Sequence, residues 1–122
     1  MRASEKQMTA GELLSVLKRK DQSLDIVFDF VFFRPKGIHS YRGYYEDLAI
    51  GYESGTQTKV GDVVAMLDGV IGQTLHGYKG GEYHMDSGTV LWVANHNESG
   101  GTAIVDVVDD KYRIILKTEM VD

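Results

Sequence analysis

The chain has 122 residues, of which 43% are hydrophobic and 25% charged, and its formal net charge is −5. This length suits one domain spanning residues 1–122, and the composition is that of a folded chain. The acidic balance argues against a general binder of DNA or RNA, although two or three arginines in one pocket would suffice for a small phosphate-bearing ligand. The lack of cysteine excludes disulfides, thiol catalysis and cysteine-based zinc sites.

The hydrophobic residues form no run near the ~20 residues that a membrane-spanning helix needs. Residues 1–8 also lack the apolar core of a signal peptide. We therefore expect a cytoplasmic protein with no membrane partner.

The first predicted element is an amphipathic helix over residues 10–20. Thr9 and Glu12 fit a capping box, and Met8 and Leu13 have the spacing of a hydrophobic staple. The apolar residues that follow keep helical spacing. Basic residues at positions 18–20 suit the negative end of the helix dipole.

Residues 24–52 predict two strands. From 24 to 33 the residues alternate, and Asp25 and Asp29 fall on the face that we expect to meet solvent. The segment 34–37 predicts a turn, and a second strand follows over 40–52. A polar loop is expected over residues 53–58.

A second amphipathic helix is expected to begin at Lys59, because the apolar residues from 60 to 71 keep helical spacing. Beyond it we predict a short strand over 73–78, a strand over 90–94, and a hairpin of 103–108 with 112–117 across Asp109 and Asp110. The order is helix, two strands, helix and four strands. This order predicts an α+β fold with a mainly antiparallel sheet and two amphipathic helices.

The segment from Gly77 to Asp86, with the strand that leads to Asn95, is the most informative for function. Its glycines let the backbone approach a ligand, its aromatic rings can stack, and asparagine can read an adenine edge. Lys79 adds a cation at a turn. The alternative is a tight hairpin whose aromatics face the core, and the spacing alone favours this alternative. Trp92, on an apolar strand, is likewise more typical of a core than of a ligand platform.

Residue patterns typical of catalysis are missing. The four histidines lack the spacing of a metalloprotease pair, no serine lies in a nucleophile elbow, and the glycine pairs match no phosphate loop. We therefore expect no enzyme, no metal ion and no cofactor. Two alternatives stay open: a hydrolase or phosphodiesterase that uses His84, Asp86 or His96, with or without a metal, and a protein-interaction module.

Two arginines stand beside tyrosines, Arg42 and Arg113. An arginine can grip a phosphate with two donors in one plane and can stack on an aromatic ring. Taken singly, each arginine is more simply a strand-surface residue paired with a carboxylate.

Several segments together resemble a known family. They are Thr9–Leu14, the strand that ends at Asp29 and Phe30, Ser40–Ala49, Gly77–Tyr83, Val93–Asn95 and Tyr112–Thr118. From about residue 9 to residue 118 the chain is similar to a small phage-encoded family, the first of the Thoeris anti-defence proteins. Members are sponges, not enzymes. They sequester the cyclic ADP-ribose isomer that a bacterial TIR-domain protein makes on infection, and some also hold cyclic oligonucleotides at a second site.

The resemblance also implies which residues bind. The family places an aromatic residue and an asparagine on the adenine and arginines on the phosphates. Here it implies Asn95 and Tyr83, with Met85 as a competing aromatic position that would make the contact softer and less specific. Arg113 is the first phosphate arginine and Arg42 the second.

The resemblance further implies dimers or higher oligomers with pockets between subunits. A homo-oligomer is also expected because two apolar helix faces and an aromatic-rich sheet exceed what one small core needs.

Overall fold

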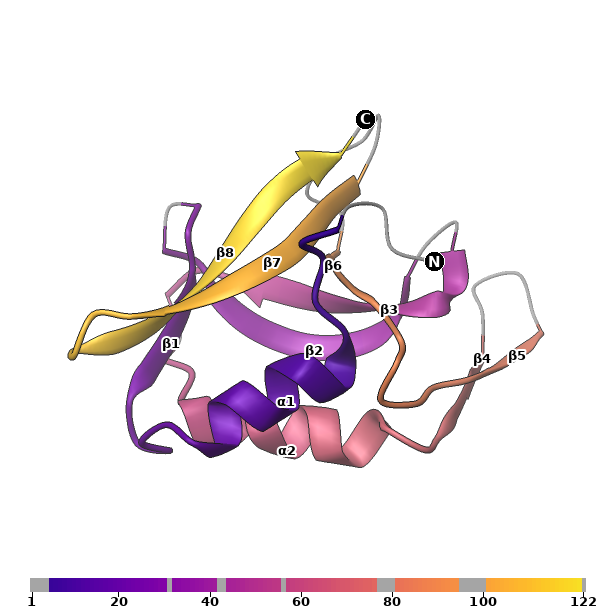
Figure 1. The fold of residues 1–122 in the computed structure, drawn as a ribbon, viewed down its shortest axis with the longest axis horizontal. Helices are drawn as coiled ribbons and strands as arrows, with labels where there is room; N and C mark the ends of the chain where they lie inside the picture. The colour runs from indigo at the N-terminus through magenta and orange to yellow at the C-terminus, as the bar shows by residue number, and fades with distance from the viewer. Residues whose placement is uncertain are drawn as a thin grey trace.

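The computed structural model describes residues 5–30, 32–41, 44–55, 57–76, 81–94 and 101–121. These residues form two helices and eight strands (Figure 1). The elements in chain order are α1 (Ala10–Lys18), β1 (Asp25–Phe28), β2 (Arg34–Tyr41), β3 (Tyr44–Glu53), α2 (Val60–Val70), β4 (Thr74–His76), β5 (Glu82–His84), β6 (Leu91–Val93), β7 (Gly101–Asp109) and β8 (Arg113–Val121).

Six strands form one sheet in the order β1-β8-β7-β6-β3-β2, and β4 and β5 form a separate antiparallel pair. The pairs β1·β8 and β3·β6 are parallel and the other three are antiparallel. The end strands approach each other, since the Phe28 amide donates to the Phe33 carbonyl at 2.7 Å. The predicted α+β fold with two helices is confirmed, but the sheet is mixed and nearly closed. The helices lie side by side beneath it (Figure 1).

Helix α1 begins where the sequence predicts. The Glu12 amide donates to the Thr9 hydroxyl at 3.2 Å, and the Thr9 amide donates to the Glu12 carboxylate at 2.9 Å, which completes the capping box. One face of α1, with Ala10, Leu13 and Leu17, is buried. Helix α2 begins at Val60, one residue after the predicted start at Lys59, which is its N-cap.

The strand predicted over 24–33 is wrong in its second half. β1 ends at Phe28, and the chain then reverses, with Phe32 in the left-handed region at φ 49°. The reversal brings aromatic rings together: Phe30 stacks on Phe28 at 5.0 Å between centroids, and Phe33 stacks on Tyr52 at 5.4 Å. Aromatic packing across the end of the sheet therefore outweighs the alternating pattern.

Residues 34–52 also differ from the prediction of one turn and one strand. Arg34–Gly37 belongs to β2, where Pro35 is tolerated because β2 is an edge strand. A register shift follows Pro35, and Gly37 has φ 75° there. The chain reverses between Tyr41 and Tyr44, which face each other as strand partners. The predicted single strand is thus a hairpin.

The glycine- and aromatic-rich segment contributes β5, so five strands follow α2 rather than the predicted four. Its antiparallel pairing with β4, and the packing of Tyr83 against the main core, agree with the hairpin alternative, whereas residues 77–80 lie outside the described part of the chain. The predicted β7–β8 hairpin is also confirmed, and both of its strands are longer than expected.

The sheet separates two apolar clusters because side chains alternate along each strand. In β6, Leu91 and Val93 point into the main core beneath the sheet, while Trp92 points to the opposite face. The main core also contains buried residues of both helices. The cluster on the opposite face, called the outer cluster below, consists of Tyr41, Ala49, Val90, Trp92, Ala94 and Ala103. No helix in the described part of the chain is long and apolar enough to cross a membrane.

Candidate ligand-binding site

Three of the six predicted site residues, Arg42, Lys79 and Asn95, lie outside the described residues. Their places in the chain are nevertheless informative. Arg42 directly follows the last residue of β2, Lys79 falls between β4 and β5, and Asn95 follows β6.

The outer cluster is built around two aromatic rings. Tyr41, at the end of β2, stacks on Trp92 of β6 with 4.6 Å between ring centroids and 7° between planes. Both side chains are buried, with exposed fractions of 7% and 4%. Trp92 is therefore a packed residue, as its sequence context indicates. The pair links the end of the edge strand β2 to a central strand of the sheet.

A buried carboxylate fixes the tryptophan. The Trp92 indole Nε1–H donates to Asp47 Oδ2 at 2.9 Å, and Asp47 is only 5% exposed. Burial raises the pKa of the Asp47 carboxyl above its ordinary value, while the hydrogen bond from Trp92 opposes that rise. The bond fixes the indole plane, and with it the ring on which Tyr41 stacks.

Gly101 of β7 lies directly against the two rings of the outer cluster. A Cβ atom at this position would lie 2.2 Å from Trp92 Cζ3 and 2.8 Å from the Tyr41 hydroxyl oxygen. Only glycine leaves room for both rings. Thr102, the next residue, has a buried hydroxyl with no hydrogen-bond partner among the described residues.

Tyr83 and Met85 lie on the other side of the sheet. Met85 has no exposed surface and belongs to the main core, and its amide donates to the Gln73 carbonyl at 2.8 Å. It therefore offers no surface to a ligand in this structure. Tyr83 is half-buried and packs against the main core, with its ring above Gly81.

Arg113 is held within its own hairpin. Its Nε donates to Asp110 Oδ2 at 3.2 Å, and its guanidinium carbon lies 4.1 Å from the centroid of the Phe32 ring. Hydrogen bonds from the amides of Tyr112 and Arg113 are the main cause that lowers the pKa of the Asp110 carboxyl, and the Arg113 side chain adds to it. Arg113 thus takes the simpler role considered for it, a surface arginine paired with a carboxylate.

Arg113 is also far from the outer cluster. Trp92 pairs with Ala103, and Ala103 pairs with Glu119, which is six residue steps from Arg113 along β8. At the usual rise of a strand these steps span about 20 Å. An arginine side chain does not span this distance, so one copy of the chain does not bring Arg113 to Tyr41 and Trp92.

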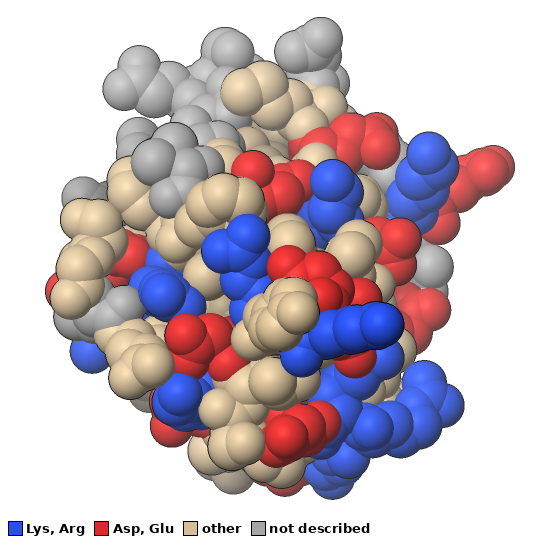
Figure 2. All heavy atoms as spheres, turned by 90° about the vertical axis from the view of Figure 1, so that its left-hand side faces the viewer, with Lys and Arg blue, Asp and Glu red and all other residues tan. Residues whose placement is uncertain are grey.

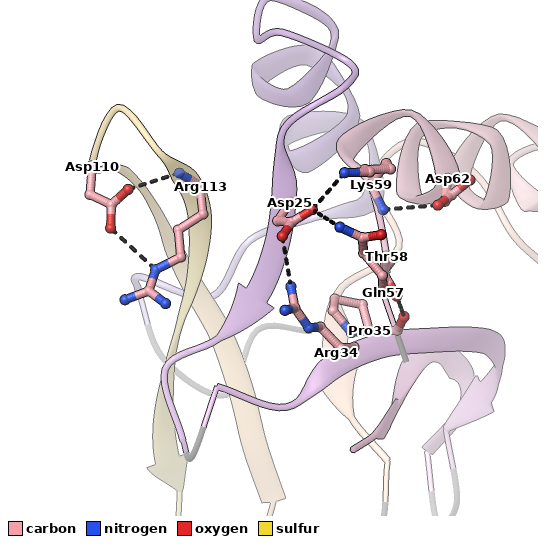
Figure 3. Close-up of polar contacts among 9 residues, drawn as sticks. All are labelled: Asp25, Arg34, Pro35, Gln57, Thr58, Lys59, Asp62, Asp110 and Arg113. Carbon is pink, nitrogen blue, oxygen red and sulfur yellow. Dashed lines mark hydrogen bonds and ion pairs between the residues drawn. The ribbon is translucent and has the colours of Figure 1, made fainter. Parts of the chain in front are cut away.

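A polar cluster that the sequence did not predict surrounds Asp25 (Figure 3). Its carboxylate accepts from Lys59 Nζ at 2.8 Å and Gln57 Nε2 at 3.0 Å, and pairs with Arg34 at 3.7 Å. The hydrogen bond from Lys59 is the main cause that lowers the pKa of Asp25. This cluster ties β1 to β2 and to the start of α2.

Asp29 is bonded as well, since it accepts from the amide of Thr118 at 3.0 Å and from its hydroxyl at 2.6 Å. The expectation that Asp25 and Asp29 simply meet solvent is therefore wrong.

The residues considered for catalysis do not gather. Among the described residues, no three histidine or carboxylate side chains could hold a metal ion together. His84 is exposed, and Asp86 caps the turn after it by accepting from the Gly88 amide at 2.8 Å. A shallow groove of about 620 Å³ runs along α1, lined by Met8, Thr9, Gly11, Glu12, Ser15, Val16, Arg19 and Ser87.

No protein-family model matches the chain, and comparison with curated proteins and with solved structures gives no match. What the chain does is therefore inferred from its residues and their geometry. The residues that sequence reasoning missed are Tyr41 and Asp47. A signal was present, because Asp47 directly precedes the apolar stretch Leu48–Ile50 and the chain has a single tryptophan.

Proposed function

We propose that the protein is a sponge of the Thoeris anti-defence type. It binds a cyclic ADP-ribose-type signal in the host cytoplasm, takes cyclic oligonucleotides as second ligands, and releases each ligand chemically intact. It is not an enzyme and needs no metal ion or cofactor.

One observation carries this proposal beyond the resemblance. Arg42 directly follows Tyr41, and Asn95 directly follows Ala94, and both of these described neighbours pack in the outer cluster. The two positions are 53 residues apart in the sequence, yet one rigid cluster anchors the chain before each of them. A phosphate-binding arginine and a base-reading asparagine are the pair that an adenine nucleotide needs.

Anchoring of the chain before Arg42 and before Asn95 suits a binding protein, because enclosing a ligand needs a complementary surface and no catalytic group. Stacking of a base on an aromatic ring contributes about 1–3 kcal/mol, and an arginine adds charge-assisted bonds to a phosphate. The outer cluster holds their neighbours Tyr41 and Ala94 in place, and such pre-organisation reduces the ordering cost of binding. Because Arg113 lies far along β8 from the outer cluster, we favour Arg42 over Arg113 as the phosphate arginine within one copy of the chain.

The first experiment separates a sponge from an enzyme. The protein is incubated with cyclic ADP-ribose isomers and with cyclic di- and trinucleotides, and its melting temperature is compared with that of the free protein. A ligand present at ~1,000 times its dissociation constant adds about 4 kcal/mol of stability. The mixture is then heated and the released small molecule analysed by mass spectrometry. An intact ligand is expected; a cleaved product would show a hydrolase, and no stabilisation by any ligand would oppose the proposal.

The second experiment tests the residues by calorimetry at two salt concentrations. We expect Arg42→Ala to weaken binding and to flatten its salt dependence, because a phosphate cation is lost. Asn95→Ala should weaken binding and blunt discrimination among bases, with the salt dependence unchanged. Lys36→Ala, which removes an exposed cation of β2, is the matched control and should bind like the wild type.

Arg113→Ala tests in the same assay whether Arg113 contributes to ligand binding. If it weakens binding as much as Arg42→Ala does, the pocket includes a residue from a second copy. Wild-type affinity in well-folded Arg42→Ala and Asn95→Ala proteins would refute the site.

A further inference from the structure

The hydroxyl of Thr102 differs from the other buried hydroxyls in the described part of the chain. Four threonines are buried there: Thr9, Thr58, Thr89 and Thr102. The hydroxyls of the first three each bond a backbone amide or carbonyl group, at 3.2, 3.0 and 2.9 Å. Thr102 is the most buried of the four, with an exposed fraction of 1%, yet its Oγ1 has no hydrogen-bond partner among the described residues.

A buried hydroxyl without a partner destabilises a fold, because it has lost its hydrogen bonds to water and gained none in return. Valine has the same branching at Cβ, favours a strand equally well and carries no polar atom. The fold of β7 therefore does not explain the hydroxyl of Thr102. A buried polar atom of this kind indicates a partner from outside the chain.

Thr102 lies where the sheet ends. It is the second residue of β7, and its strand partners are Val93, the last residue of β6, and Met120 of β8 (Figure 1). Residues paired across neighbouring strands have their side chains on the same face of the sheet. Val93 is buried, whereas Met120 is 66% exposed. The Thr102 side chain is therefore one strand away from a side chain that meets solvent.

The position of Thr102 also adjoins the proposed ligand site. Its partner Val93 is two residues before Asn95 in the sequence, and the sheet still holds the chain at Ala94, whose amide donates to a carbonyl of β3 at 3.0 Å. Gly101, the residue before Thr102, lies against the rings of the outer cluster. The end of β6 and the start of β7 thus bring the Thr102 hydroxyl beside the segment that leads to the proposed base-reading asparagine.

The opposite end of β7 is less suited to an anionic ligand. Figure 2 looks onto the end of the molecule that carries the β7–β8 turn, and it shows acidic and basic side chains interspersed there. Arg113 pairs with Asp110 at 3.2 Å, and Lys20 pairs with Asp109 at 3.7 Å. These two cations already face carboxylates, which supports the start of β7 as the end that faces the ligand.

We propose that Thr102 is a further ligand-binding residue, whose hydroxyl hydrogen-bonds the purine base that Asn95 reads. This inference rests on the proposed function. A hydroxyl both donates and accepts, so it suits a purine edge, which carries donors and acceptors side by side. Folding has already removed water from the Thr102 hydroxyl, so binding the base adds a bond without a further desolvation cost. Contact requires a local side-chain rearrangement, which is common at binding surfaces.

The test separates folding from binding in variants of a single position. Melting curves without ligand measure folding, and calorimetry with cyclic ADP-ribose and its linkage isomers as probes measures affinity. Thr102→Val should melt at or above the wild-type temperature, because it removes an unpaired buried hydroxyl. It should bind about tenfold more weakly, the usual effect of losing one buried hydrogen bond. Thr102→Ser keeps the hydroxyl and should bind much closer to the wild type than Thr102→Val does.

Thr118→Val is the matched control, because the Thr118 hydroxyl has a partner: it donates to Asp29 at 2.6 Å. This variant should show the opposite pattern, with a lower melting temperature and unchanged affinity.

Three results would overturn the inference and leave the proposed function standing. They are wild-type affinity in Thr102→Val, equal losses of affinity in Thr102→Val and Thr102→Ser, and a lower melting temperature of Thr102→Val, which would show that the hydroxyl has a partner within the chain. A wild type that binds none of the probes would instead refute the proposed function, and this inference with it.

Discussion

Replacing Gly101 by alanine should destabilise the outer cluster more than any other single-methyl change. The added Cβ would lie 2.2 Å from Trp92 Cζ3, whereas carbon atoms pack best at about 3.5–4.0 Å. The steric clash is therefore relieved only if the indole or β7 moves by at least about 1.3 Å. The indole is held by its bond to Asp47 and by the Tyr41 ring, so the movement disrupts both contacts.

The expected size follows from these contacts. Overpacking of a filled site costs about 1–3 kcal/mol, and a stacked aromatic pair contributes about 0.5–1.5 kcal/mol. We therefore expect Gly101→Ala to lower the free energy of unfolding by about 2–4 kcal/mol. Urea unfolding followed by fluorescence measures it, and Trp92 is the single tryptophan of the chain, so the probe reports on the perturbed cluster itself.

Gly69→Ala is the matched control. Gly69 lies in α2, and a Cβ there would meet no atom within 4 Å. Alanine favours a helix more than glycine does, so this variant should be at least as stable as the wild type. A Gly101→Ala protein with wild-type stability and unchanged fluorescence would refute the packing described for the outer cluster.

Two further predictions concern pH and helix capping. The pKa of Asp47 is raised in the folded state, so its contribution to stability is full below the unfolded pKa of about 3.9 and is lost as pH rises through the folded pKa. Asp47→Asn keeps an acceptor for Trp92 without the charge. In urea unfolding, the free energy of unfolding of this variant minus that of the wild type should therefore be higher at about pH 7 than at about pH 4. An equal difference at the two pH values would contradict the raised pKa. Thr9→Ala removes the acceptor of the Glu12 amide and should cost about 1–2 kcal/mol. The exposed mid-helix change Ser15→Ala should cost nothing by the same measurement, and equal losses in the two variants would rule out capping as the cause.

The elements that the sequence determined are those whose signals lie within a few residues. Thr9 and Glu12 are three residues apart, so the start of α1 could be predicted from their identity. The β7–β8 turn is equally local, because Asp109 and Asp110 accept hydrogen bonds from amides two or three residues later. Helical spacing in α2 places its buried face in the same way.

The tertiary structure decided the features that depend on distant partners. Asp29 is bonded to Thr118, 89 residues away, and Trp92 to Asp47, 45 residues away. No local pattern indicates either bond. The alternation from 24 to 33 predicts a continuous strand, but stacking of Phe33 on Tyr52 turns the chain back after Phe28.

In the candidate site, too, some features could be predicted from the sequence and others depend on the fold. The resemblance implied a base-reading asparagine and phosphate arginines, residue types that can take these roles, and the paired glycines and tyrosines indicated where the chain turns. Which of them can act together depends on the sheet order, because β2 and β6 come together only through β3. That order places Tyr41 on Trp92, buries Met85 beneath the sheet and holds Arg113 at the far end of β8. Strand order is set by the burial of whole faces rather than by neighbouring residues, and for this reason only the folded chain shows it.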